Sequence, residues 1–159
     1  MVSSSKKVSI VKATKKDMPE VAKLSIEMLK YHNVLLDNYF TIFPYEQYVE
    51  KFTKKLNDNC RILVAKIDNK VVGFLLAEFT KAPHYKNVNV CILDEIVVSE
   101  KHRSCGIGTA LFKKAMSICK EKKIEEVKLN VYNANTDAKR LYERLGFSDL
   151  RQQMSLLLK

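Results

Sequence analysis

Several residue types and patterns are scarce in this 159-residue sequence. It has four glycines, three prolines and no tryptophan, which excludes collagen-like and low-complexity chains. No apolar run approaches the ~20 residues of a membrane-spanning helix, and the polar start MVSSSKK has no hydrophobic stretch of a secretory signal behind it. We therefore expect a disordered tail at residues 1–6 and one folded domain over 7–159, with no role at a membrane.

Cysteine and histidine are also too dispersed to form a recognisable metal or redox motif. The sequence has no CxxC pair and no histidine at metal-ligand spacing. The residues concerned are Cys60, Cys91, Cys105, Cys119, His32, His84 and His102. This usage predicts reduced, structural thiols in a cytoplasmic protein without a metal site.

Positive charge is abundant, with 28 Lys or Arg against 18 Asp or Glu and a formal net charge of +10. Such a balance favours anionic partners: nucleic acid, a phosphorylated cofactor or an acidic surface. The basic pairs are spread along the chain, and no aromatics or groove-reading motif interrupt them. We therefore expect a lysine-rich solvated surface and no nucleic-acid partner.

Hydrophobic periodicity predicts alternating strands and helices. Helices are expected over 14–33, from Pro44 to about 56, over 108–122 and over 135–146. Strands are expected over 8–13, 60–67, 70–79, 88–99, 125–132 and from Phe147 to about 158, with a hairpin turn at Asp68-Asn69. This order predicts an α/β fold, a mixed sheet with helices on both faces.

The stretch SEKHRSCGIGTAL (99–111) places two glycines between a predicted strand and a predicted helix. A Walker phosphate loop is excluded because Thr109 follows Gly108 where that loop has lysine. A dinucleotide fingerprint lacks its third glycine, since position 111 is Leu. Close helix–strand packing is one remaining interpretation. The other is a pyrophosphate site, where the backbone N–H groups of 103–108, the helix dipole and the Arg103 charge attract an anion.

Two motifs resemble those of one known family. Arg103-x-x-Gly106-x-Gly108, after a strand ending in Ile96-x-Val98, resembles the acyl-CoA motif of the GNAT superfamily of N-acetyltransferases. Residues 133–147 resemble its next motif, Asn-x-x-Ala-x-x-x-Tyr-x-x-x-Gly-Phe. The resemblance implies a single GNAT domain over 7–159, a sheet splayed between its fourth and fifth strands, and acetyl-CoA as cofactor. Ser104 departs from the motif because many members have glycine there, although serine still presents its N–H.

The resemblance also implies which residues bind coenzyme A. They are the strand backbone of Ile96, Val97 and Val98, the loop residues Arg103, Ser104, Cys105, Gly106, Ile107, Gly108 and Thr109, and the second-motif residues Asn135, Ala138 and Tyr142. Asn135 is expected both to cap its helix and to bond the cofactor, two roles that compete for one side chain.

The same resemblance assigns Tyr142 to protonation of the leaving thiol, although a tyrosine packed in a helix face would show the same pattern. Asp94 or Glu95 is the expected general base. Strand alternation puts their side chains on opposite faces, and it favours Asp94, which would share a face with Ile96 and Val98. A carboxylate here would equally suit binding of a cationic acceptor.

The acceptor site is expected beside the first two helices and the loop at 81–87. Tyr31, His32 and Tyr39, together with Asp94, are the candidate acceptor-binding residues, as a cation–π site or as core. We expect a small amine as acceptor, such as a polyamine or amino sugar. Protein lysine or N-terminal acetylation and a non-catalytic acyl-CoA sensor are the alternatives. A homodimer would be in keeping with the family.

Overall fold

The computed structural model of the chain describes residues 7–82, 88–156 and 158. Its strands are β1 (Ser9–Lys12), β2 (Cys60–Ile67), β3 (Lys70–Ala82), β4 (Val88–Val98) and β5 (Glu126–Leu129). Its helices are α1 (Met18–Leu35), α2 (Tyr45–Lys54), α3 (Ile107–Glu121) and α4 (Thr136–Arg144), with short 3-10 turns η1 (Lys15–Asp17) and η2 (Glu100–His102). The expected tail at 1–6 and the loop residues 83–87, with His84, lie outside the described residues.

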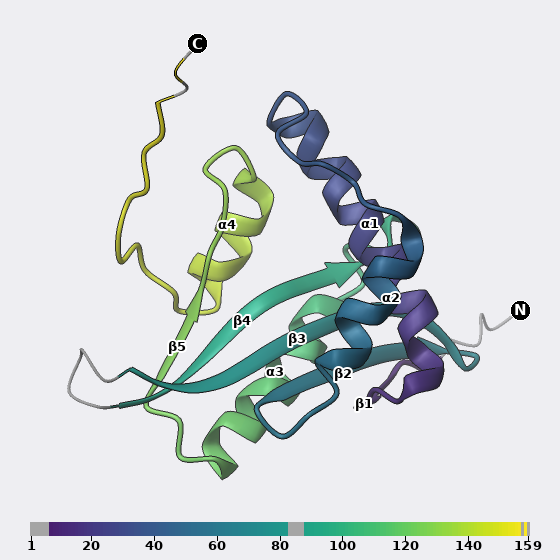
Figure 1. The fold of residues 1–159 in the computed structure, drawn as a ribbon. Helices are drawn as coiled ribbons and strands as arrows, with labels where there is room; N and C mark the ends of the chain where they lie inside the picture. Colours follow the sequence, from purple (N-terminus) through teal and green to yellow (C-terminus); the bar gives the residue numbers. More distant parts are fainter. Residues whose placement is uncertain (1–6, 83–87, 157, 159) are drawn as a thin grey trace, which may run out of the picture.

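One five-stranded sheet in the order β1-β2-β3-β4-β5 forms the centre of the fold (Figure 1). The first four strands pair antiparallel, whereas β4 and β5 pair in parallel. That last pairing runs from Val90↔Glu126 to Leu93↔Leu129, although β4 continues to Val98. The sheet therefore opens into a V between its fourth and fifth strands, as the family resemblance implied.

The hairpin between β2 and β3 has the expected turn. Asp68 and Asn69 both adopt positive φ angles, 49° and 62°. Two consecutive residues in this region fit a tight hairpin turn whose twist matches that of the flanking strands, and Asp and Asn tolerate the conformation better than most residues.

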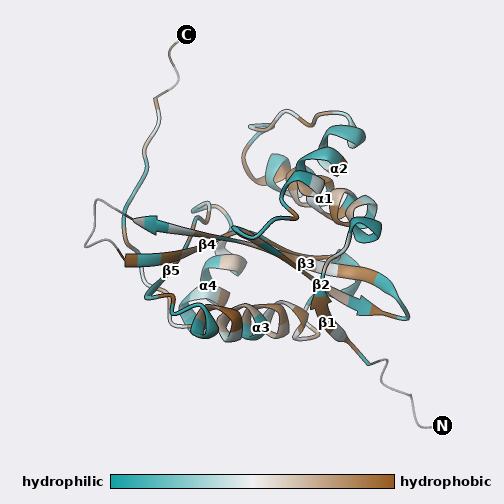
Figure 2. Ribbon diagram, turned by 60° about the horizontal axis from the view of Figure 1, so that its bottom comes forward, coloured by the Kyte–Doolittle hydropathy of each residue, from teal (hydrophilic) through white to brown (hydrophobic). Residues whose placement is uncertain are grey.

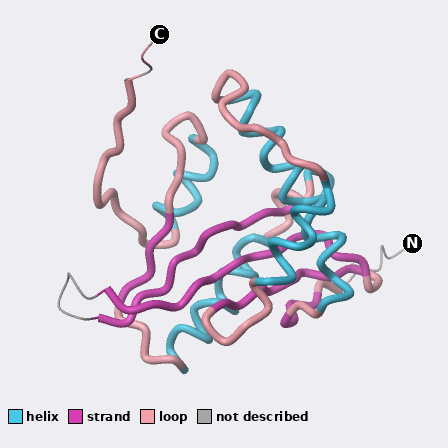
Figure 3. Tube along the Cα trace, viewed as in Figure 1, coloured by secondary structure: helices cyan, strands magenta, loops and turns pink. Residues whose placement is uncertain are grey.

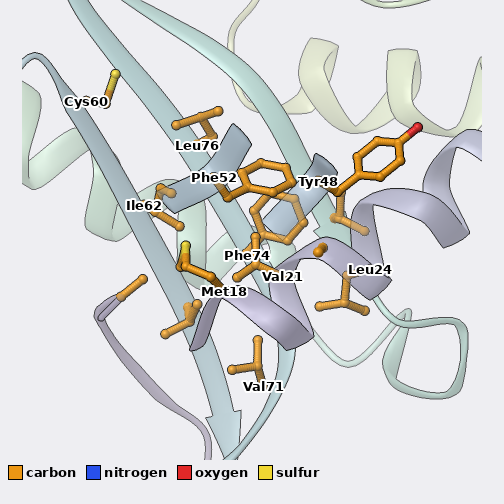
Figure 4. Packing of buried hydrophobic residues seen from close by; sticks show 14 residues of the cluster. Met18, Val21, Leu24, Tyr48, Phe52, Cys60, Ile62, Val71, Phe74 and Leu76 are labelled. Atoms are coloured by element: carbon orange, nitrogen blue, oxygen red, sulfur yellow. The ribbon is translucent and has the colours of Figure 1, made fainter. Parts of the chain in front are cut away.

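Helices cover both faces of the sheet and bury a core against each (Figure 2). On one face α1 and α2 pack Met18, Val21 and Phe52 against Phe74 of β3, with the Phe52 and Phe74 rings 5.5 Å apart (Figure 4). On the other face α3 packs through Leu111 and its neighbours, and the end of α4 joins this cluster through Leu145 and Phe147. No helix within the described ranges is long and apolar enough to cross a membrane.

The predicted final strand from Phe147 is wrong for the residues that the structure describes. Residues 148–156 form no helix or strand, and this part of the chain follows a loop path away from the sheet (Figure 3). Leu150, Met154 and Leu156 remain 72–84% exposed. Alternating apolar residues favour an extended chain, but a strand is stabilised only by pairing with a neighbour and burying one face.

Gly73 lies where β3 and β4 approach closely, and we expect Gly73→Ala to destabilise the fold by about 1–3 kcal/mol. A Cβ there would lie 2.9 Å from the backbone oxygen of Val97, which cannot move without disturbing the sheet. Urea unfolding measures the change. Gly108→Ala is the control, because its Cβ would meet only Val98 Cγ2 at 3.9 Å. In the first turn of a helix it should raise the stability by up to about 1 kcal/mol. Equal effects at the two positions would contradict the steric explanation.

Candidate active site

A β-bulge interrupts β4 at the point where the V opens. Leu76 of β3 pairs with Glu95 and the next residue, Ala77, pairs with Leu93, so Asp94 is the extra residue. Alternation is reset there: Leu93, Ile96 and Val98 all pack in the α3-side cluster. Glu95 instead contacts α1 and α2. A bulge redirects side chains in this way and is common near functional sites.

The bulge overturns the prediction that Asp94 shares a face with Ile96 and Val98. Asp94 is exposed. Its charge acts on Lys55, whose pKa is raised mainly by its bond to Glu78 and to a small extent by Asp94. Lys55 is the C-cap of α2, so the charge of Asp94 is felt on the α1–α2 side. Strand alternation therefore cannot decide whether Asp94 or Glu95 is the better candidate for the general base.

Glu95 is a buried carboxylate with a partner on each oxygen. It is 8% exposed; Ser25 Oγ of α1 donates to Oε2 at 2.8 Å, and Lys51 Nζ of α2 donates to Oε1 at 2.7 Å. Pairing and hydrogen bonding offset the large desolvation penalty of such a charge. The three residues tie β4 to both helices, and with both oxygens engaged Glu95 is a poor proton acceptor unless Lys51 releases it.

The loop after β4 holds backbone conformations that expose its N–H groups. Ser104 and Gly106 adopt left-handed φ angles of 62° and 76°. Gly106 is the N-cap of α3 and provides no side-chain cap, so the first N–H groups of that helix have no partner within it. Uncapped N–H groups at a helix N-terminus favour an anion. Ser104, where many family members have glycine, adopts the conformation that glycine adopts without steric cost.

The side chains of this loop are arranged around that N-terminus. Arg103 is exposed, donates through Nε to the Val98 oxygen at 3.2 Å, and its guanidinium lies 5.2 Å from the centre of the Tyr31 ring. Cys105 is exposed, whereas Ile107 is buried in the α3-side cluster. Thr109 and Gly108, in the first turn of α3, are half-buried.

An aromatic cluster lies across the opening of the V. It joins the end of α1, the following loop and the segment between β5 and α4, with ring centres 5.2–6.1 Å apart along the chain of contacts. Its members are Tyr31, His32, Tyr39, Phe40 and Tyr132. The structure thus brings together the three predicted acceptor-binding aromatics. Sequence reasoning missed Tyr132, which it placed inside a strand that in fact ends at Leu129. Its signal was its position just before the second motif.

Asn135 uses different atoms for its two contacts. Its Oδ1 accepts from the Ala138 N–H at 3.2 Å, which caps α4, and its Nδ2 lies 3.4 Å from Nε2 of His32. Capping therefore occupies the amide oxygen and does not require the amide nitrogen.

Tyr142 lies on α4 with its ring 5.9 Å from that of Phe147. Burial raises the pKa of its hydroxyl above the ordinary value of ~10. It is therefore a protonated phenol at neutral pH and can act only as a proton donor there.

The described residues offer no metal-binding cluster. Within residues 7–82, 88–156 and 158, no group of three or more His, Cys, Asp or Glu side chains could hold a metal ion. Surface hollows of about 430 and 250 Å³ lie elsewhere, one near Lys122 and one near Lys12, and neither includes a predicted site residue.

We expect Ser25→Ala to lower the unfolding free energy by about 1–3 kcal/mol, because it removes the donor to a buried carboxylate oxygen. Ser117→Ala is the matched control: Ser117 also donates to a glutamate, Glu121, at 3.4 Å, but on the exposed surface. That change should stay within about 0.5 kcal/mol. Chemical denaturation measures both, and similar losses would contradict a special role for the Glu95 contact.

Known acetyltransferases resemble this chain in sequence. The model of the acetyltransferase (GNAT) family matches residues 28–147. An N-alpha-acetyltransferase of Sulfurisphaera tokodaii is 32% identical over 115 residues, covering 69% of this chain and 67% of that protein. A protein of Archaeoglobus fulgidus named as an uncharacterized N-acetyltransferase is 26% identical over 93% of this chain and 96% of its own.

Among solved structures, a mutant of the BH1408 protein of Bacillus halodurans has the same fold. Its TM-score is 0.88 at 24% identity, and the match covers 95% of this chain and 99% of the other. The family match extends from α1 through the V and the loop to the end of the second motif. The chain therefore belongs to the GNAT acetyltransferase family and is an acyl-CoA-dependent acetyltransferase.

Proposed function

We propose that this chain transfers an acetyl group from acetyl-CoA to a primary amine by direct attack in a ternary complex. The observation that supports this most strongly is the edge of β4 beyond Leu93 that faces β5 without pairing to it, next to the uncapped N-terminus of α3. Backbone groups without a strand partner can bind an extended, amide-bearing arm. The adjacent N–H groups and Arg103 suit a diphosphate.

The residues present fit coenzyme A, which when bound supplies the acetyl thioester. The loop from Arg103 to Gly108 and the first turn of α3 would hold the pyrophosphate. The backbone of Ile96, Val97 and Val98 would pair with the amide-bearing arm and polarise the thioester carbonyl. One such preorganised donor contributes roughly 3 kcal/mol of transition-state stabilisation. Asn135, Ala138 and Tyr142 would line the other side of the V.

Tyr142 would protonate the departing thiolate. The phenol is protonated at neutral pH; although its raised pKa makes it a weaker acid than a thiol of ordinary pKa near ~8.5, it can donate its proton as the thiolate leaves when the attacking nitrogen replaces that proton. The position of Tyr142 in the second motif and its burial beside Phe147 support this assignment.

The acceptor would bind at the aromatic cluster, where Tyr31, His32 and Tyr39 offer ring faces to a cation. We propose a small amine. A second candidate, the α-amino group of a polypeptide, is supported by the name of the S. tokodaii relative. Tyr39 and Tyr132, 67% and 42% exposed, leave the cluster open enough for a longer acceptor. A cytoplasmic location and a homodimer remain predictions.

Calorimetric titration with acetyl-CoA, with NAD as control, tests the cofactor. Release of the coenzyme A thiol then measures turnover with spermidine, an amino sugar, and peptides with free or blocked N-termini. Turnover with the small amines supports the first acceptor, and turnover with only the free N-terminal peptide supports the second. Binding of NAD in place of acetyl-CoA would refute the cofactor assignment.

Arg103→Gln should weaken acetyl-CoA binding about 10- to 100-fold, because a charge-assisted contact to phosphate contributes about 1.5–3 kcal/mol. Calorimetry measures the dissociation constant. Arg151→Gln, a substitution of an exposed arginine in the C-terminal segment, is the matched control and should leave it unchanged. An unaltered affinity in Arg103→Gln would remove this side chain from the cofactor site.

Tyr142→Phe should lower kcat roughly 100-fold while leaving the acetyl-CoA dissociation constant unchanged, since it removes a proton donor and keeps the ring. Tyr45→Phe is the control; the Tyr45 hydroxyl donates to the Pro19 oxygen at 3.1 Å, away from the V. Steady-state kinetics at saturating acetyl-CoA distinguish them. Full turnover by Tyr142→Phe would mean that the ring serves packing alone.

A further inference from the structure

We propose that His32 is the catalytic group that takes the proton of the acceptor amine, with Asn135 selecting its tautomer and Glu95 stabilising the imidazolium. The inference rests on the proposed function and goes beyond it by assigning the base to α1. It also gives a role to the one imidazole in a cluster whose other described members are tyrosine and phenylalanine rings.

The contact with Asn135 determines which nitrogen of His32 is basic. Because Asn135 Oδ1 accepts from the Ala138 N–H, the atom 3.4 Å from His32 Nε2 is the amide nitrogen, which can only donate. Nε2 must therefore accept, and the ring proton resides on Nδ1. A protonated Nε2 would face another donor, so the contact also favours the neutral ring.

The surroundings of His32 keep it neutral until a proton is delivered. The ring is half-buried, and this burial lowers its pKa below the ordinary value, while the charge of Glu95 acts in the opposite direction. The groups that face it or its neighbours are Tyr31, Phe40, Tyr132, Asn135, Glu95 and, over the Tyr31 ring, Arg103. A neutral imidazole has a basic lone pair on Nε2, whereas both oxygens of Glu95 are engaged by Ser25 and Lys51.

Glu95 acts on His32 along one face of α1. Ser25, which binds Glu95, and His32 are seven residues apart, about 10 Å along the helix axis. The carboxylate oxygens are bonded to Ser25 and Lys51, and their charge favours the positive charge that forms on the imidazole on proton transfer. Glu95 is thus a positioning and electrostatic residue.

The amide nitrogen of Asn135 links this base to the cofactor. The family resemblance implies a bond from Asn135 to acetyl-CoA; because the amide oxygen caps α4, the nitrogen is the atom left to make it, and its long 3.4 Å contact with His32 is easily exchanged. When the nitrogen turns to the cofactor, Nε2 loses its donor and its lone pair becomes free for the amine. The base is therefore released only in the loaded enzyme.

His32 Nε2 takes one proton from the ammonium form of the acceptor. The freed nitrogen lone pair attacks the thioester carbonyl carbon, forming the C–N bond. The C–S bond then breaks with its electron pair on sulfur. Tyr142 gives its proton to the thiolate, the second proton lost by the attacking nitrogen restores the Tyr142 phenol through solvent, and His32 returns its own proton to solvent.

His32→Gln tests the proposal with acetyl-CoA and whichever amine of the panel is turned over. We expect kcat to fall about 100- to 10,000-fold. The wild type should lose activity at a pH below the ordinary histidine value of ~6.5, because burial lowers the pKa of His32, and this loss should be absent in His32→Gln. The acetyl-CoA dissociation constant should not change. Lys30→Gln, an exposed substitution on the same helix, controls for the new glutamine.

Nitrogen-15 NMR of the wild-type imidazoles gives a readout that depends on neither turnover nor folding of a variant. At pH 7 we expect His32 to be neutral with its proton on Nδ1, and the Nε2 resonance to shift when acetyl-CoA is added. A proton on Nε2, or an Nε2 signal indifferent to acetyl-CoA, overturns the proposal. An unchanged pH profile in His32→Gln overturns it while leaving the proposed function intact. No turnover by the wild type with any amine overturns both.

Discussion

Strand β4 continues beyond its last pairing with β5, and the site depends on the hydrogen bonds that this leaves unmade. From Asp94 to Val98 the edge toward β5 has no strand partner. Backbone groups in such a position must be satisfied by water or by a ligand with matching amides. The splay thus converts part of a sheet interior into a binding edge, with the loop and α3 beginning at its far end.

A buried charge links the layers around that edge, which the hydrophobic core packs together. Glu95 bonds Ser25 and Lys51, so one carboxylate connects β4 to both α1 and α2. Buried pairs of this kind add little net stability, but they are sensitive to the loss of one partner. The same carboxylate is felt at His32. Glu95 thus both links the two helices to β4 and acts electrostatically on His32 at the acceptor end of the site.

The sequence predicted most of the features that short stretches of chain determine, such as turns and helices. It missed those that depend on how one strand pairs with another. The hairpin at Asp68-Asn69 and the helices are local and were predicted correctly. The bulge at Asp94 leaves no mark in the sequence, because an extra residue in one strand is defined only against its partner. The strand expected after Phe147 was likewise predicted wrongly, because a strand forms only where a neighbouring strand pairs with it. Tyr132 became visible as a site residue only when β5 proved to end before it.

The left-handed conformation of Ser104 sets two effects on stability against each other at one position. A side chain in that region carries a steric cost of about 1–2 kcal/mol that glycine does not carry. Glycine, however, lacks a hydroxyl and leaves the loop freer in the unfolded chain. Selection for heat-resistant variants would therefore favour substitutions at this residue for their effect on stability and not on catalysis. The melting temperature of a variant in this loop would say little about its activity.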